Sequence, residues 1–468
     1  MWIGRQNELN DLQTRFEQRG FQLVAIYGRR RIGKTRLISE FIEGKRTVYY
    51  TATQNEPEIQ LRDLTQAIAE AFSDNSLLSG MKTFQSFEAA FTFLAEEAAS
   101  KRLIFVIDEY PYLAKAYTAI SSVLQKMIDR KFKNTELYLI LSGSSMSFME
   151  KQLLGYESPL YGRRTGQIRL NPLPYYESIK FFPNWNQEDR LYAYGLCGGI
   201  PQYLEIAARW NSFSDAVENE LLSATGGLHN EPEFLLKEEL REPAVYNAII
   251  DAVAKGKNKV NEIADAVHKP GATISAYLKN LLALDILERN MPIEETSAKK
   301  AIYQLKDPLF HFWYRFVPGC QFYIMMRKNH DAYLKKILPF LPEYFGHIFE
   351  EICLQYILRE TQKGNLKEIY DTYGRWWGIN PETRQQEDID IACADSEHIL
   401  TGECKWRNEA VDFGVYNTLK RRTLLIQKNR TPEYVLFSKA GFDEKLVSLN
   451  VDDPSLTLVG LEELTHEN

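Results

Sequence analysis

The segment FQLVAIYGRRRIGKTRLISEFI, residues 21–42, constrains the fold more than any other part of the chain. An apolar run at 23–27 predicts a short buried strand, and the amphipathic pattern at its end predicts a helix. Between them lies G-x-x-x-x-G-K-T, whose glycines let backbone N–H groups wrap a phosphate at the N-terminus of a helix. A strand, loop and helix of this kind predict a parallel α/β sheet.

The loop predicts that ATP and Mg²⁺ are the cofactors. Lys34 would reach the β and γ phosphates, and Thr35 would hold the Mg²⁺ ion. The candidate nucleotide-binding residues of the loop are Gly28, Arg29, Arg30, Arg31, Ile32, Gly33, Lys34, Thr35 and Arg36.

A second metal ligand is expected from a neighbouring strand, and KRLIFVIDEYPYL supplies it. After the apolar run at 103–107, Asp108 would hold Mg²⁺ directly or through water, and Glu109 would polarise the attacking water. A third buried strand, ELYLILSGSS, ends in hydroxyl groups that could sense the γ-phosphate. Ser142, Ser144 and Ser145 carry them, and Ser144 is our candidate.

Two arginines, Arg163 and Arg164 in SPLYGRRTGQIRL, precede a further predicted strand. From there an arginine finger could reach a γ-phosphate in cis or in trans. A solvated basic pair is the alternative, and the sequence leaves both open.

Taken together, the stretches WIGRQNEL, YGRRRIGKTRL, FVIDEYPYL, LILSGSS, SPLYGRRTG and GGIPQYL resemble the archaeal-type ATPases of the STAND branch of the AAA+ superfamily, over roughly residues 1 to 230. The resemblance implies that Ile3 and Gly4 lie beside the adenine and that Pro201 closes over the base. It also implies a helical lid after about residue 172. STAND proteins are usually switches that bind ATP tightly, turn it over slowly and pass a conformational change to appended domains.

The middle of the chain changes character. VNEIADAVHKPGATISAYLKNLLALDILERN predicts a helix at 260–267, a turn, and a second helix at 272–284. ILERN and AIYQLKD could pair as the wing of a winged helix-turn-helix. The second helix offers Lys279 as its one exposed cation, so both a DNA reader and a structural coupler stay open.

The last part of the chain predicts an α-β-β-α-β order. YFGHIFEEICLQYILRE is a helix, RWWGINPETRQQEDIDIACA gives a bend and a strand, and HILTGECKWRN is the next strand. AVDFGVYNTLKRRTLLIQ is a second helix and EYVLFSKAGF a last strand. With Asp390 on one strand and Glu403-Cys404-Lys405 on the next, this order resembles the PD-(D/E)xK restriction-endonuclease-like fold. More narrowly, it is similar to the C-terminal domain that often follows archaeal-type ATPases. Ile389 stands where the usual motif has a proline.

The resemblance implies a metal-dependent nuclease site. Asp390 and Glu403, with the carbonyl of Cys404, could hold one Mg²⁺ ion on oxygen ligands, and Glu350 could reach the metal through water. Lys405 would orient or activate the nucleophile and offset developing charge. An inactive domain that is structural or binds DNA is the alternative.

Composition narrows the partners and the compartment. A net charge of −7 and a pI of about 5.7 argue against a tight non-specific DNA binder. Five scattered cysteines, no apolar leader and no long apolar run predict a cytoplasmic protein without a membrane span.

We therefore expect four domains: an ATPase core at 1–171, a helical lid at 172–240, a winged helix at 241–330 and a nuclease-like domain at 331–468. The predicted function is an ATPase that controls a metal-dependent DNA nuclease. The alternative is a nucleotide-dependent switch that binds DNA or a partner protein without cutting. A homo-oligomer is a further expectation that the sequence leaves open.

Overall fold

The structure is a computed structural model that describes residues 2–73, 83–156, 158–297, 300–366 and 368–466. The chain divides into two compact units. The first unit comprises Met1–Pro172 with Ile200–Gln202, and the second comprises Leu173–Gly199 with Tyr203–Asn468. The four predicted domains are a finer division, which stays a prediction.

The first unit contains a five-stranded sheet with the order β2-β3-β4-β1-β5, and every pairing in it is parallel. The strands are β1 (Gln22–Tyr27), β2 (Thr47–Thr51), β3 (Leu103–Asp108), β4 (Leu137–Gly143) and β5 (Gly166–Arg169). The predicted parallel α/β sheet is confirmed. Because the strands are parallel, their carboxyl ends meet at one edge, where ligands of such sheets bind.

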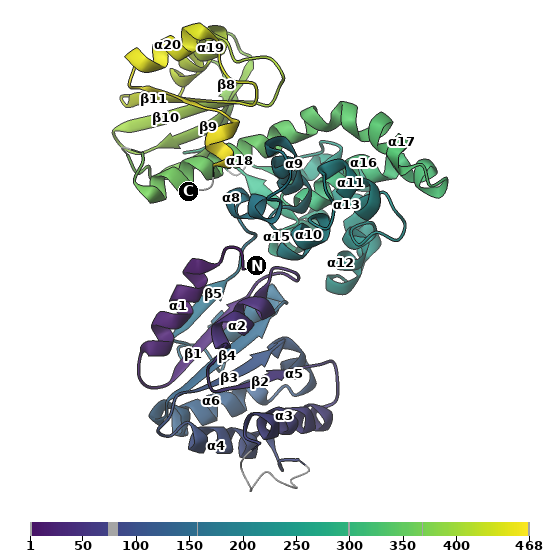
Figure 1. Cartoon of the computed structure of the whole chain (residues 1–468), viewed down its shortest axis with the longest axis vertical. Coiled ribbons are helices and arrows are strands. Elements are labelled where there is room, and N and C mark those ends of the chain that lie inside the picture. Colours follow the sequence, from purple (N-terminus) through teal and green to yellow (C-terminus); the bar gives the residue numbers. More distant parts are fainter. Residues whose placement is uncertain (1, 74–82, 157, 298–299, 367, 467–468) are drawn as a thin grey trace. The chain divides into compact units, whose positions relative to one another are not determined.

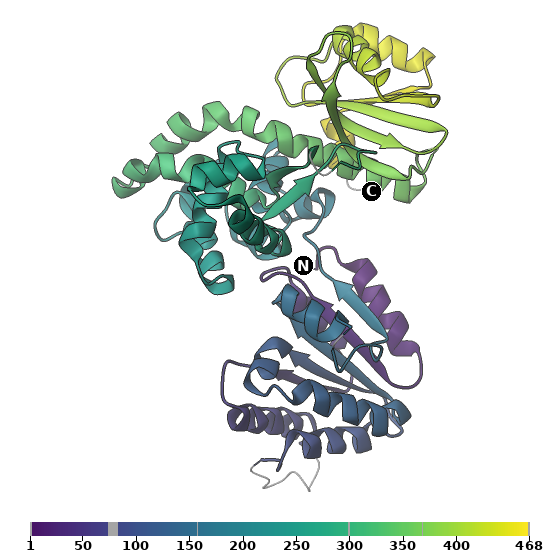
Figure 2. The same cartoon turned by 180° about the vertical axis from the view of Figure 1, so that it is seen from behind.

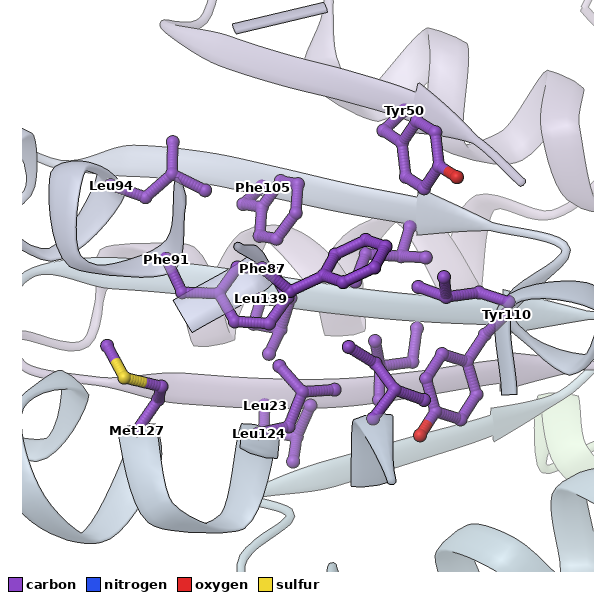
Figure 3. Packing of buried hydrophobic residues seen from close by; sticks show 14 of the residues in the cluster. Leu23, Tyr50, Phe87, Phe91, Leu94, Phe105, Tyr110, Leu124, Met127 and Leu139 are labelled. Atoms are coloured by element: carbon purple, nitrogen blue, oxygen red, sulfur yellow. The ribbon is translucent and has the colours of Figure 1, made fainter. Parts of the chain in front are cut away.

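Helices cover both faces of this sheet, as Figure 1 and Figure 2 show from opposite sides. On one face the rings of Phe16 and Phe41, from α1 and α2, pack against Tyr138 of β4. On the other face Leu23, Phe105 and Leu139 meet residues of α4 and α6 in one core (Figure 3). Burial on both faces explains why β1, β3 and β4 are apolar throughout instead of alternating.

The remaining elements of the first unit follow the same alternation. They are α1 (Gln6–Glu17), α2 (Lys34–Ile42), α3 (Pro57–Ala71), α4 (Phe87–Glu97), α5 (Tyr110–Ala116), α6 (Ile120–Arg130) and α7 (Met146–Met149), with short helical turns at Phe132–Asn134 and Glu150–Leu154.

The second unit begins with helices in the region of the predicted lid. They are α8 (Tyr175–Ser178), α9 (Gln187–Cys197), α10 (Pro201–Ala207), α11 (Phe213–Ala216) and α12 (Glu231–Glu239), with turns at Ile179–Phe181 and Val217–Leu221. The helix α10 starts in residues that belong to the first unit, so the chain passes three times from one unit to the other.

The next elements have the order expected for a winged helix. Three helices, α13 (Pro243–Ala254), α14 (Val260–Val267) and α15 (Gly271–Ala283), precede β6 (Leu287–Asn290) and β7 (Ile302–Leu305). The two strands pair antiparallel. The predicted helices at 260–267 and 272–284 and the pairing of the two strands are confirmed, while the winged-helix assignment stays a prediction.

The chain continues through α16 (Pro308–Met325), α17 (Asn329–Ala332), turns at Tyr333–Ile337 and Leu338–Phe340, and α18 (Leu341–Lys363). A second five-stranded sheet follows, with the order β12-β11-β10-β9-β8. It comprises β8 (Thr372–Ile379), β9 (Gln386–Ala394), β10 (His398–Lys405), β11 (Thr431–Ser438) and β12 (Leu456–Val459), with α19 (Phe413–Thr423), α20 (Glu444–Asp452) and α21 (Leu461–Thr465).

Two parts of the predicted α-β-β-α-β order are wrong. The stretch EYVLFSKAGF, expected to be the last strand, is followed by α20 and by β12, which pairs parallel with β11. The second error concerns the hairpin before it. The stretch 375–394 was expected to be a bend and one strand, but it forms a hairpin in which β8 pairs antiparallel with β9. The turn of this hairpin begins at Asn380, whose side chain accepts the N–H groups of Glu382 and Thr383. Arg384, at the end of the turn, has a φ of 57°. Asparagine stabilises such turns through its side chain, so Asn380 sets the turn and the tryptophans extend the strand.

All five cysteines are free and buried. Among the helices in the described ranges, none combines the length and apolar character needed to cross a bilayer.

A pair of glycines ends α9 and allows a close backbone crossing. Gly198 and Gly199 have φ values of 60° and 71°. The N–H of Leu173 donates to the carbonyl of Gly199 at 2.8 Å, and a Cβ on Gly199 would lie 1.9 Å from the Leu173 carbonyl oxygen. A side chain at this position would therefore meet both backbone strain and a steric clash.

We expect Gly199→Ala to destabilise the second unit more than Gly256→Ala does. Gly256 also has a positive φ, of 87°, but a Cβ there would meet nothing within 4 Å. The control should lose about 1 kcal/mol from strain alone, and Gly199→Ala at least twice that, because rigid backbone must move. Denaturant unfolding would measure both, and equal losses would contradict the role of the crossing.

Candidate functional site

The phosphate-binding loop joins β1 to α2 at the carboxyl edge of the first sheet. Arg31 and Gly33 have φ values of 68° and 91°, which turn the chain into the start of α2 at Lys34. The Lys34 ammonium donates to the carbonyls of Gly28 and Arg29 at 2.9 and 3.1 Å. Lys34 is thus held across the mouth of the loop, where a phosphate between the loop and the lysine would take over its contacts.

Asp108, at the end of β3, is the centre of a hydrogen-bond network. Its Oδ2 accepts from the Thr35 hydroxyl at 3.1 Å and from the Tyr49 hydroxyl at 2.8 Å. Its Oδ1 accepts the N–H of Glu109 at 3.1 Å. The predicted Mg²⁺ ligands Thr35 and Asp108 therefore lie side by side, and both are the hard oxygen donors that Mg²⁺ prefers.

Glu109 and Ser144 are also brought together, from the ends of β3 and β4. Glu109 has a left-handed conformation with a φ of 52°. Its Oε2 accepts both the backbone N–H of Ser144, at 3.2 Å, and the Ser144 hydroxyl, at 2.9 Å. Ser144, the candidate among the three serines, therefore contacts Glu109 directly. Its role in sensing the γ-phosphate stays a prediction.

The other residues of the predicted nucleotide site surround the loop. A Cβ on Gly28 would lie 2.6 Å from the Leu170 carbonyl oxygen, so Gly28 allows β5 to approach. Pro201 lies beside Gly33, 3.7 Å from where a Cβ would stand. Arg30 donates to the Tyr112 hydroxyl at 2.8 Å. Ile32 and Arg29 are buried, Arg31 is partly buried, and Arg36 is exposed.

Arg5 was missed by sequence reasoning. Its guanidinium donates to the carbonyl of Ile32 in the loop at 3.3 Å and to the carbonyl of Asn171, after β5, at 2.6 Å. It thereby ties Ile3 and Gly4, the residues expected beside the adenine, to the phosphate-binding loop. Its position directly after Gly4 was visible in IGRQNEL, but no spacing rule indicated which backbone carbonyls it would meet. Tyr49 was missed for the same reason.

Arg163 and Arg164 lie at the other edge of the sheet. They precede β5, and Thr165 donates its N–H to the carbonyl of Leu23 near the start of β1. Arg163 forms a two-point ion pair with Asp129, at 3.0 and 2.7 Å, and this contact lowers the pKa of Asp129. Arg164 donates to the Leu153 carbonyl at 3.2 Å. This placement argues against a finger in cis, and a finger in trans stays a prediction.

The second candidate site lies on β9 and β10, in the second unit. Asp390 accepts the N–H of Cys404 through Oδ2 at 2.9 Å. The Lys405 ammonium lies 2.6 Å from Glu403 Oε1 and 3.9 Å from Asp390 Oδ2. Arg422, from α19, stands 3.6 Å from the same Glu403 oxygen. The structure thus gathers Asp390, Glu403 and Lys405.

Glu350 reaches this region from α18 but is already paired. Its Oε2 lies 2.8 Å from the Arg375 guanidinium, and its Oε1 lies 3.4 Å from His347 Nδ1. Across the residues that the structure describes, no three histidine, cysteine, aspartate or glutamate side chains converge as a ready ligand set for a metal ion. A role for Glu350 through water therefore stays a prediction.

The electrostatics of this cluster are unusual for carboxylates. Burial, followed by the charges of Glu403 and Glu350, raises the pKa of Asp390 to about 7. Burial alone would lower the pKa of Lys405, but the charges of Glu403 and Asp390 outweigh it and raise that pKa. Glu403 Oε2 is buried without a hydrogen-bond partner. An orphaned oxygen and a destabilised carboxylate side by side are what a divalent cation would relieve.

Comparisons with known proteins concern both ends of the chain. Residues 2–206 match a family described as an ATPase domain predominantly from Archaea. Residues 313–419 match a family of archaeal and bacterial proteins of unknown function. The first match confirms a nucleotide-binding ATPase domain at the N-terminus, while the second carries no activity.

Individual relatives agree with these matches. An uncharacterized protein of Methanocaldococcus jannaschii, MJECL04, is 30% identical over 432 residues, which cover 91% of this chain and 92% of that protein. An uncharacterized ATP-binding protein of the same organism is 41% identical over 46 residues, 10% of this chain and 78% of that one. The structure of a Walker-type ATPase of Pyrococcus abyssi superposes with a TM-score of 0.53 at 23% identity, over 67% of this chain and 96% of that chain. At this identity the likeness shows a shared fold.

Asp390 should make the second unit less stable as pH rises. An aspartate in an unfolded chain ionises near pH 4, whereas Asp390 keeps its proton in the folded chain until about pH 7. Between these values the folded chain binds the extra proton, so raising the pH costs stability, by a few kcal/mol in all since one pKa unit is about 1.4 kcal/mol.

We therefore expect Asp390→Asn to flatten the loss of stability between pH 4 and 7 in the presence of a chelator. Asp388→Asn is the matched control. It removes the same charge from the same strand, but the Asp388 side chain is 53% exposed. Denaturant titrations across this pH range would test the difference. If the free energy of unfolding changed with pH in the same way for wild type and Asp390→Asn, the pKa of Asp390 would not be raised in the folded chain.

Proposed function

This chain belongs to the same protein family as MJECL04 of Methanocaldococcus jannaschii and carries an archaeal-type ATPase domain, and on that premise we propose that its ATPase cycle controls a metal-dependent DNA nuclease in the C-terminal part. The gathering of Asp390, Glu403 and Lys405 on adjacent strands carries the nuclease half of this proposal. The ATPase half draws its support from the network around Asp108.

In the ATPase site each residue has a separate task. Lys34 and the loop N–H groups hold the phosphates, and Thr35 and Asp108 hold Mg²⁺ when it is bound with the nucleotide. Glu109 orients and polarises the attacking water. Because Ser144 holds the Glu109 carboxylate, the position of this base depends on the strand that would also sense the γ-phosphate.

In the C-terminal site Asp390, Glu403 and the carbonyl of Cys404 would hold a divalent cation, which supplies Lewis acidity toward a phosphodiester. Their oxygens suit Mg²⁺, and the unpartnered Glu403 Oε2 supports this fit. The cation would replace Lys405 as the partner of the two carboxylates. Lys405 would then be available to orient the nucleophile.

A switch that binds DNA or a partner protein without cutting is the second candidate. The observation that favours it is the pairing of two of the three carboxylates with cations of the chain: Glu350 with Arg375, and Glu403 with Lys405. Such pairs satisfy the carboxylates without a metal. The net charge of −7 agrees with weak general affinity for nucleic acid.

Glu109→Gln should keep ATP bound and stop its turnover. The amide oxygen can still accept from Ser144, so the loop is preserved, but the base is lost, which typically costs about 10²- to 10³-fold in rate. Binding of a fluorescent ATP analogue and phosphate release would be measured together, with Lys34→Ala as the variant that should lose binding itself. Turnover at the wild-type rate in Glu109→Gln would assign the water to another residue.

Lys405→Ala should lower DNA cleavage by about 10²- to 10³-fold, the cost of losing about 3 to 4 kcal/mol from one preorganised electrostatic group. DNA affinity should barely change, since one cation among several phosphate contacts contributes modestly. Lys363→Ala, which removes an exposed charge at the end of α18, is the control. Cleavage assays with Mg²⁺ or Mn²⁺, with and without ATP, decide the matter. If the wild-type protein cuts no DNA under any of these conditions, the nuclease is excluded and the switch without cleavage remains.

A further inference from the structure

Asp390 of the carboxylate site lines a cavity in the second unit. The cavity has a volume of about 540 Å³ and lies among β6, β7, α18 and β8. Asp390 and Glu350 line one part of it, together with Arg375 and His347. Tyr303 and Trp377 add aromatic rings to the lining. Acidic, cationic and aromatic groups therefore line the same cavity.

Residues 291–297, which follow β6, are called the wing turn here, and Met291 at its start lines this cavity. The N–H of Ile293 donates to the carbonyl of Arg375 at 2.9 Å, so the wing turn pairs with the edge strand β8. The Ile293 side chain packs over Gly374, where a Cβ would stand only 3.1 Å from its methyl group. The wing turn is thus seated on the strand that carries Arg375.

Ion pairs fasten the wing turn on its other side. Glu294 contacts both Lys428, at 2.9 Å, and Arg430, and the hydrogen bond from Arg430 lowers the pKa of Glu294. Lys428 and Arg430 lie just before β11. The wing turn therefore bridges β8 and the start of β11. It is engaged within the unit, whereas a wing that reads DNA has to be exposed to the nucleic acid.

We propose that the cavity receives the free end of a single DNA strand, and that the wing turn excludes duplex and closed circular strands. This inference rests on the proposed nuclease function and names the substrate class of the same site. A volume of about 540 Å³ falls in the range of roughly 300–1,000 Å³ for small-molecule pockets, which suits a terminal nucleotide. A duplex is wider than a single strand, and Met291 of the wing turn lines the cavity that it would have to enter.

The lining groups match the parts of a strand end. Bases without a complementary strand stack on aromatic faces, and Trp377 and Tyr303 offer such faces. A phosphate competes well for an arginine, so an entering strand would draw Arg375 away from Glu350. Glu350 and Asp390 would then both be available to a cation. The strand end itself thereby opens the acidic groups that would act on it.

The test is competition binding with the full chain in Ca²⁺, which takes the same oxygen ligands as Mg²⁺. A short linear strand with an internal fluorophore is the probe, and unlabelled linear, circular and duplex DNA of equal length are the competitors. We expect the linear strand to compete at least tenfold better than the circle or a blunt duplex. Equal competition by the circle, or no binding of the probe at all, would overturn the proposal.

Variants locate the binding. Trp377→Ala and Arg375→Ala should each weaken probe binding about tenfold, whereas Lys279→Ala, on the exposed face of α15, should leave it unchanged. Trp377→Phe keeps an aromatic face and should retain most of the affinity, which separates stacking from a folding defect. Loss of binding in Lys279→Ala but not in the cavity variants would place the DNA on α15 and refute the proposal.

Glu294→Ala tests the wing turn. Loss of its contacts to Lys428 and Arg430 should let the circular strand compete within threefold of the linear one. An unchanged preference would show that the wing turn does not exclude circles.

Cleavage in Mg²⁺ keeps this inference separate from the proposed function. If a linear strand binds in the cavity without being cut, the proposed nuclease function is excluded and the proposed binding site is kept. A closed circular plasmid cut as fast as a linear strand would keep the nuclease and remove the requirement for an end.

Discussion

A carboxylate buried on a strand has to be compensated, and each candidate site is built around one: Asp108 at the end of β3 and Asp390 in the middle of β9. Asp108 is 4% exposed and Asp390 is 8% exposed. A buried charge is costly unless hydrogen bonds or opposite charges satisfy it. Around Asp108 two hydroxyl groups and one N–H group do so. The positions of Thr35, Tyr49 and Glu109 follow from that requirement.

Around Asp390 the compensation is incomplete, and this difference separates the two sites. One N–H group reaches it directly, while Lys405 stands at 3.9 Å and is shared with Glu403. Burial raises the pKa of Asp390, and the charges of two further carboxylates, Glu403 and Glu350, raise it more. Ionisable groups with strongly shifted pKa values cluster at functional sites, because a bound ligand can stabilise their charged form. The cavity beside Asp390 gives such a ligand access.

The sequence predicted what depends on local pattern. The apolar runs of β1, β3 and β4 predicted the parallel sheet, and α14 begins and ends where the sequence placed it. The motifs also predicted that Thr35 lies near Asp108 and Asp390 near Lys405, because the phosphate-binding loop and β3 end at one edge of their sheet and β9 and β10 are neighbouring strands. These features depend on residues near each other in sequence or on neighbouring strands.

Features that depend on distant contacts were beyond the sequence. The stretch 375–394 was predicted to hold a bend and one strand, since two tryptophans fit a strand as well as a bend, but it forms a hairpin. Arg163 faces Asp129, whose helix gave no sign of pairing with it. The seating of Ile293 on β8 joins residues about eighty positions apart. No periodicity or spacing rule carries information of that kind.

The claim that Asp390 and Glu403 form a metal site is tested most directly by Mn²⁺ uptake. Calorimetric titration of Asp108→Asn, without nucleotide, removes the ATPase site from the signal. The account predicts binding in this variant at millimolar Mn²⁺ or below, and its loss when Asp390→Asn is added. No uptake by Asp108→Asn, or uptake that survives the second substitution, would contradict it.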